Sequence, residues 1–140
     1  MYEKDYIMRQ IQEFFNALRK ILRLIDESKT KIEDINIQLN ELYVKYFEKE
    51  KDFFYTNSVD TIISYFDNNI KSLDTINKIK MLSELMYYSI IIEKTDNKID
   101  LLKKVLQFYE YIENCSNSFS IEQNNRIKKI MELINKFQNW

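Results

Sequence analysis

KIKMLSELMYYSIIIEKTDNKIDLLKKVLQFYEYIE, residues 78–113, holds two apolar-striped segments that are separated by the polar residues Thr95, Asp96 and Asn97. In each segment apolar residues recur every three or four positions, which is the period of an α-helix with one buried face. The first stripe includes Ile79, Leu82, Leu85, Met86 and Ile90, and the second includes Leu101, Leu102, Val105, Phe108 and Ile112. This stretch therefore predicts an antiparallel helical hairpin.

The first quarter of the chain repeats the helical pattern. From Asp5 onward its apolar residues alternate spacings of four and three, at Ile7, Ile11, Phe14, Leu18, Ile21 and Ile25. A second helix is expected to open at Thr30–Glu33 (TKIE), a capping box in which Thr30 and Glu33 satisfy backbone N–H groups reciprocally. It is expected to end near Glu48–Lys51, and the aromatic residues Phe53–Tyr55 then break the rhythm.

Polar residues that precede apolar stripes mark the remaining helix starts. We expect Ser58 to cap a short helix, Asp74 to cap the first helix of the hairpin, and Asp96 or Asn97 to cap the second. SIEQ (Ser120–Gln123) is a second capping box, before a final stripe. The sequence thus predicts about six helices in one all-α domain over residues 1–140. Residues 1–70 form N-terminal helices, and residues 74–140 form the hairpin plus a C-terminal helix.

The chain contains no His, no Gly and no Pro, and these absences limit both its fold and its chemistry. Without Gly, folds rich in tight turns are disfavoured and a glycine-rich phosphate loop is excluded. Asn is the next best residue for the left-handed position at a helix end, and it occurs at Asn57, Asn68, Asn69, Asn97, Asn114 and Asn117. Without His, neutral-pH acid–base catalysis and the common metal sites lose their main residue. We expect no catalytic residue, no metal and no cofactor.

The net charge and the single cysteine indicate where the protein is located and which kinds of partner it binds. The net charge of −1 argues against a dominant nucleic-acid or membrane surface. Basic clusters at Arg19–Arg23 and Arg126–Lys129 are interpreted as ordinary helix surface, with phosphate contact as the alternative. Cys115 is the only cysteine, and we expect a half-buried spectator. The longest apolar stretch, Leu85–Ile92, is far short of a membrane span. We expect a cytoplasmic protein with no nucleic-acid and no membrane partner.

Two segments before the hairpin carry a resemblance to a known kind of protein. DYIMRQIQEFFNALRKIL (residues 5–22) and LNELYVKYF with DFFYTNSVDTIISYF (residues 39–47 and 52–66), followed by the hairpin, resemble a family of small uncharacterised bacterial helical proteins. That family is similar to tetratricopeptide repeats in its C-terminal part. In the hairpin, Leu82 and Leu85 match the large apolar positions of the first repeat helix, while Met86 stands where the repeat has a small residue. The resemblance implies a right-handed, repeat-like helical stack and no activity.

Aromatic residues are in excess, with ten Tyr, nine Phe and one Trp. MYYS (Met86–Ser89) and FYEY (Phe108–Tyr111) each place adjacent rings about 100° apart on a helix, so the rings cannot all enter one narrow core. One interpretation is that exposed rings act as anchors for a protein partner, and the candidates are Tyr87, Tyr88, Tyr109 and Tyr111. The other interpretation is a wide helical face that serves two core layers.

These observations favour a non-enzymatic, helical-repeat module that offers a groove to a protein or peptide partner. The alternative is a structural bundle that self-associates, as a homodimer for example, through the unbroken stripe from Ile7 to Ile25. An enzyme or a nucleic-acid effector is the weakest hypothesis, because the residues for its chemistry are missing.

Overall fold

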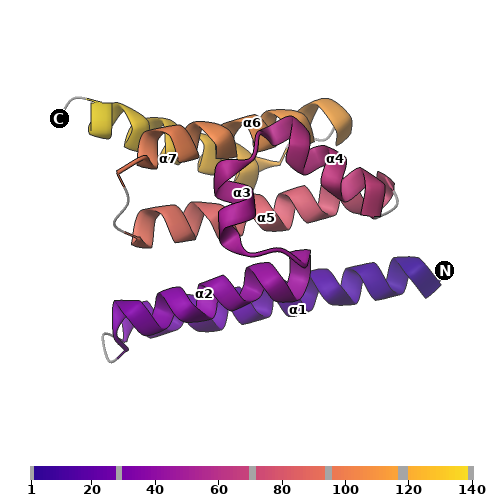
Figure 1. The fold of residues 1–140 in the computed structure, drawn as a ribbon, viewed down its shortest axis with the longest axis horizontal. Helices are drawn as coiled ribbons and strands as arrows, with labels where there is room; N and C mark the ends of the chain where they lie inside the picture. The colour runs from indigo at the N-terminus through magenta and orange to yellow at the C-terminus, as the bar shows by residue number, and fades with distance from the viewer. Residues whose placement is uncertain (1, 28–29, 70–71, 94–95, 117–119, 139–140) are drawn as a thin grey trace.

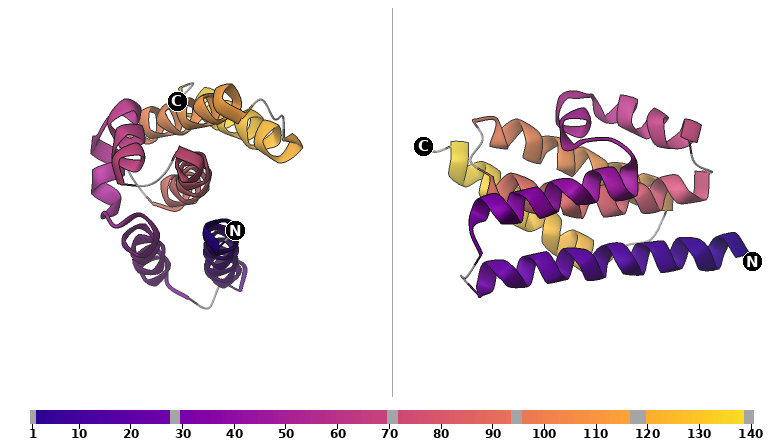
Figure 2. Two further views of the ribbon diagram at one scale, coloured as in Figure 1. Left: turned by 90° about the vertical axis from the view of Figure 1, so that its right-hand side faces the viewer. Right: turned by 60° about the horizontal axis from the view of Figure 1, so that its bottom comes forward.

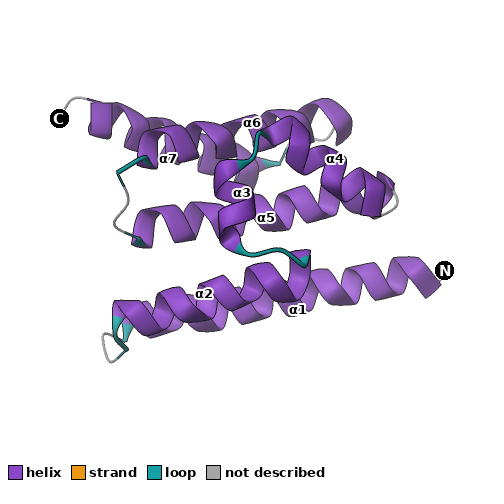
Figure 3. Cartoon of the chain, in the orientation of Figure 1, coloured by secondary structure: helices purple, strands orange, loops and turns teal. Residues whose placement is uncertain are grey.

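The computed structural model describes residues 2–27, 30–69, 72–93, 96–116 and 120–138. Within these ranges the chain is helical throughout and contains no strand, so the all-α prediction is confirmed (Figures 1 and 3). The described helices are α1 (Tyr2–Asp26), α2 (Ile32–Phe47), α3 (Lys51–Thr56), α4 (Val59–Asn69), α5 (Ser72–Ile92), α6 (Lys98–Ser116) and α7 (Ile121–Gln138).

Helix α5 lies at the centre of the fold, and the other helices curl around it (Figure 2). It packs against α1, α2, α4 and α6, and α6 packs in turn against α7. A helix surrounded in this way must be apolar on most of its circumference. Accordingly, α5 buries residues on several faces, among them Ile79, Met81, Leu82, Leu85, Met86, Tyr87 and Ile90.

Aromatic rings join the N-terminal hairpin to the rest of the core. The fully buried Phe47 ring meets Phe14, Phe54 and Phe66 at centroid distances of 5.9, 5.7 and 5.9 Å. Phe54 belongs to α3, a helix in a segment that was expected only to break the helical rhythm. The described chain therefore has seven helices where about six were predicted. The additional helix forms because tertiary packing of Phe54 stabilises six residues that would not be helical alone.

Five predicted helix starts have different outcomes. Ser58 and Ser120 cap as expected, because their Oγ atoms accept from the backbone N–H of Thr61 (3.2 Å) and Gln123 (3.3 Å). The box at Thr30 is wrong, since α2 begins one residue later with Lys31 at the N-cap and no side-chain cap bond. Asp74 is not a cap either: α5 starts at Ser72, so Asp74 lies in its first turn. Helix α6 starts at Lys98, which leaves Asn97 immediately before it.

Two helices end without glycine and without the predicted left-handed asparagine. Glu48, not an asparagine, takes the left-handed conformation after α2, with φ 61°, and it is the one described residue with positive φ. Asn57 follows α3 in an extended conformation with φ −89°. Lysine side chains from other helices reach the free carbonyls: Lys78 Nζ donates to Tyr46 O at 2.6 Å, and Lys104 Nζ donates to three carbonyls at the end of α3.

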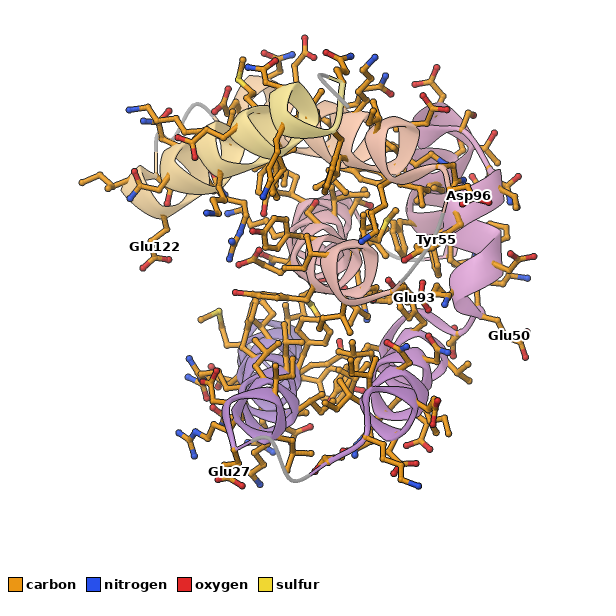
Figure 4. The ribbon with its side chains drawn as sticks, turned by 90° about the vertical axis from the view of Figure 1, so that its left-hand side faces the viewer. Glu27, Glu50, Tyr55, Glu93, Asp96 and Glu122 are labelled. Carbon is orange, nitrogen blue, oxygen red and sulfur yellow. The ribbon has the colours of Figure 1, made fainter. Side chains whose placement is uncertain are left out.

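A polar link ties α3 to the end of α5. Lys51 forms an ion pair with Glu93, and the Tyr55 hydroxyl donates to Glu93 Oε2 at 3.4 Å. Figure 4 shows Tyr55 and Glu93 turned toward each other, while Glu50 points outward. Burial raises the pKa of Tyr55 above its ordinary value, and the charge of Glu93 adds to this effect. Tyr55 therefore remains a neutral donor.

Candidate functional site

Residues of α1, α5, α6 and the start of α7 line a cleft. Figure 2 shows the ribbons of α1 and α7 on either side of α5. The volume of the cleft is about 300 Å³, and we call it the α1–α7 cleft. The lining residues come from α1 (Ile11, Phe15), α5 (Asn77, Lys80, Met81, Glu84), α6 (Tyr109) and the start of α7 (Ser120, Glu122, Gln123, Arg126). Figure 4 shows Glu122 at the edge of the molecule, pointing toward the open side between α7 and α1.

An ion pair between α7 and α5 forms the polar end of the cleft. Arg126 Nε donates to Glu84 Oε2 at 3.0 Å and Arg126 Nη2 donates to Glu84 Oε1 at 3.2 Å, so the guanidinium binds the carboxylate in bidentate fashion. Arg126 Nη2 also donates to the Tyr88 hydroxyl at 2.9 Å. The guanidinium carbon lies 4.0 Å from the centroid of the Tyr87 ring, which is a cation–π contact.

Tyr109 completes this cluster from α6. Its hydroxyl donates to Glu84 Oε2 at 3.2 Å, so one carboxylate oxygen accepts from both Tyr109 and Arg126. Burial raises the pKa of Tyr109, and the neighbouring charge of Glu84 raises it further. Burial alone would lower the pKa of Arg126, but the hydrogen bonds and charge of Glu84 and the contact with Tyr88 together outweigh burial and raise it. The cluster is therefore a fixed ion pair whose carboxylate also accepts from Tyr109 and whose guanidinium also donates to Tyr88.

The opposite wall of the cleft is apolar. Ile11 and Phe15 of α1 are both half-buried and line the cleft, although they pack against the core on one side. They differ from Phe14 and Leu18, which are buried in the interior of the fold. The α1–α7 cleft thus offers an apolar wall facing a polar one, which is the arrangement of sites that bind amphipathic ligands.

Three of the four predicted tyrosines meet at this cluster, but not as exposed anchors. Tyr87 and Tyr109 are each only 3% exposed, so the prediction of exposed rings is wrong for these two. Helix α7 packs against α6, and its Arg126 side chain reaches α5 and covers the Tyr87 ring. Tyr88 is half-buried, as is Tyr111. Tyr87, Tyr88 and Tyr109 each contact Arg126 or Glu84, and so they hold this ion pair in place.

Tyr111 lies elsewhere, in a second cleft of about 320 Å³ between α4 and α6 that is lined also by Ser58, Asp60 and Gln107. Burial and a hydrogen bond with Cys115 raise the pKa of Tyr111 to about 12. Cys115 itself is exposed, which corrects the prediction of a half-buried thiol. The structure thus separates Tyr111 from the other three tyrosines.

The sequence interpretation missed Glu84 and Arg126. Arg126 had been assigned to ordinary surface together with its neighbours, yet its side chain is 21% exposed and that of Glu84 is 27% exposed. One signal was available: Glu84, Tyr87 and Tyr88 are spaced i, i+3 and i+4, which places them on one face of a helix. Nothing in the sequence spacing indicated that Arg126, from another helix, would meet this face.

Comparison with models of known protein families, with curated proteins and with solved structures finds no match for this chain. Among the described residues, no three potential metal-ligating side chains converge. None of the described helices combines the length and the apolar character needed to cross a membrane.

Proposed function

We propose that the protein is a non-enzymatic helical interaction module, and that it binds a segment of a partner protein in the α1–α7 cleft. The observation that carries this proposal is the pairing of an apolar wall, Ile11 and Phe15, with a rigid polar wall built on Arg126 and Glu84. Binding sites of this kind use a few fixed polar groups for orientation and apolar contacts for affinity.

The order of the helices supports a repeat-like module. In Figure 1, α1, α5 and α7 run in one direction, and α2 and α6 run in the opposite direction. Within this order α2 packs against α5 and α6 packs against α7, so each returning helix contacts the first helix of the next unit. The three first helices line the cleft, as expected for the concave face of a tetratricopeptide-like stack. The resemblance to a bacterial family and the cytoplasmic location remain predictions.

Rigidity of the polar wall also favours binding. Arg126 is held by a bidentate carboxylate, a hydroxyl and an aromatic ring, so little side-chain entropy remains to be lost when a partner docks. The half-buried Phe15 offers an aromatic edge opposite this group. Aromatic residues and arginine are the side chains that contribute most to protein–protein binding.

The test compares two aspartate substitutions at half-buried phenylalanines, Phe15→Asp in the cleft and Phe53→Asp in α3. Both variants lose some core packing, so the second one controls for the loss of stability. We expect proteins captured by the wild-type chain from its native lysate to be retained by Phe53→Asp and lost by Phe15→Asp. Equal retention by both variants would remove the cleft from the binding surface.

Self-association through α1 is a second candidate. Helix α1 leaves Tyr6 65% exposed and Met8 49% exposed, which are large fractions for side chains of this type. A dimer through this helix would cover them. We expect sedimentation to show a concentration-dependent dimer that Met8→Glu disrupts, and a wild-type chain that remains monomeric at every concentration would eliminate this candidate.

A further inference from the structure

Four charged residues line the α1–α7 cleft, two of each sign. Glu84 and Arg126 bind each other. Lys80 and Glu122 form no ion pair within the described part of the chain, and Glu122 lies in the first turn of α7, where the helix dipole favours a negative charge. The lining by itself is therefore neutral.

Helical register adds one basic residue to each wall beyond this lining, which gives the opening an excess of positive charge. On α7, Lys129 lies seven residues after Glu122 and three after Arg126, so it belongs to the side of the helix that lines the cleft. On α1, Arg19 lies four residues after Phe15 and continues that side in the same way. Both side chains are exposed, and neither forms an ion pair among the described residues.

Apolar and basic side chains thus lie next to each other along both walls of the opening. Ile11 and Phe15 supply the apolar contact on α1, and Leu133, four residues after Lys129, is half-buried on α7. A ligand complementary to this surface carries apolar side chains along one face and carboxylates beside them. Complementary potentials speed association and reject partners of the wrong charge.

We propose that the partner segment is an acidic amphipathic peptide, which lays its apolar side chains on Ile11 and Phe15 and places carboxylates beside Arg19, Lys80 and Lys129. This proposal rests on the binding function proposed above for the same cleft. Arg126 positions the surface without contributing free charge, because its charge is already used by Glu84.

The experiment uses the full chain and three synthetic amphipathic helical peptides of equal length. All three carry leucine at the same positions, and their polar positions carry Glu, Gln or Lys. Binding is followed by fluorescence anisotropy of a labelled peptide. We expect the Glu peptide to bind about three- to tenfold more tightly than the Gln peptide, since exposed ion pairs contribute modestly, and the Lys peptide to bind most weakly. Added salt should narrow these differences.

Two double variants with the same change in net charge locate the effect. Lys80→Glu with Lys129→Glu reverses charge at the cleft, whereas Lys103→Glu with Lys128→Glu changes exposed lysines that do not line it. We expect the first variant to lose the preference for the Glu peptide and the second to keep it. Equal loss in both variants would overturn the proposal, because the effect would then be one of net charge.

The same measurements test the acidic partner and the binding cleft separately. If Phe15→Asp abolishes the binding of all three peptides, but the peptides bind equally tightly to the wild type, the acidic partner is refuted and the binding cleft stands. If none of the peptides binds, or if Phe15→Asp changes nothing, the acidic partner and the cleft function proposed for this chain are both refuted. Tighter binding of the Lys peptide than of the Glu peptide would also refute an acidic partner.

Discussion

Replacing Lys104 by methionine tests how this glycine-free chain terminates its helices. Lys104 Nζ of α6 donates to Phe54 O at 3.2 Å, Tyr55 O at 2.7 Å and Asn57 O at 2.7 Å. These carbonyls lie at the end of α3, where no further turn of helix supplies backbone N–H donors to them. Methionine keeps most of the apolar stem of the side chain but leaves the three carbonyls without the ammonium donor.

The magnitude follows from the number and type of bonds. A hydrogen bond to a charged group contributes about 1.5–3 kcal/mol, but Lys104 is half-buried and burial lowers its pKa, so part of this gain offsets the cost of desolvating the ammonium. We expect a net loss of about 2–3 kcal/mol in the free energy of unfolding. For a chain of 140 residues this loss corresponds to a fall in Tm of roughly 8 °C.

Urea denaturation followed by circular dichroism measures this loss, and the adjacent residue provides the control. Lys103 is exposed on the same helix, so Lys103→Met should change the free energy of unfolding by less than about 0.5 kcal/mol. A Lys104→Met variant as stable as Lys103→Met would refute the view that a lysine from α6 caps α3.

Three further predictions concern the buried polar groups. A double-mutant cycle on Glu84→Gln and Arg126→Met should give a coupling of about 1 kcal/mol, and additive effects would contradict the bidentate pair. Tyr43→Phe, which removes a buried hydroxyl bonded to Ser89 Oγ at 2.9 Å, should cost about 1 kcal/mol, whereas Tyr6→Phe at an exposed site should be neutral in the same urea assay. Burial raises the pKa of Tyr43 and Tyr109, so above about pH 10 the unfolded chain releases protons that the folded chain keeps, and stability falls as pH rises. The phenolate absorbance of the buried tyrosines should therefore appear together with loss of helix, and ionisation of every tyrosine in a folded chain would contradict this prediction.

Much of the helical architecture was predictable from periodicity and capping. The stripe on α1 correctly identified Phe14, Leu18 and Ile21 as buried, and the serines that precede α4 and α7 cap as expected. These features are local, since a residue's angle about its helix axis and its backbone neighbours follow from sequence spacing alone. Local reasoning failed at α3, where six residues are helical because Phe54 packs against rings that are distant in sequence.

The candidate site joins residues of different helices, and sequence spacing does not relate such residues. Periodicity and composition were enough to predict a helical chain without His, Gly or Pro and with a surplus of tyrosine. They could not show that Tyr87 and Tyr109 are buried, that Arg126 of α7 binds Glu84 of α5, or that a cleft lies between α1 and α7. Periodicity fixes which side of a helix is apolar, whereas the neighbour that covers each side is selected by packing among all seven described helices.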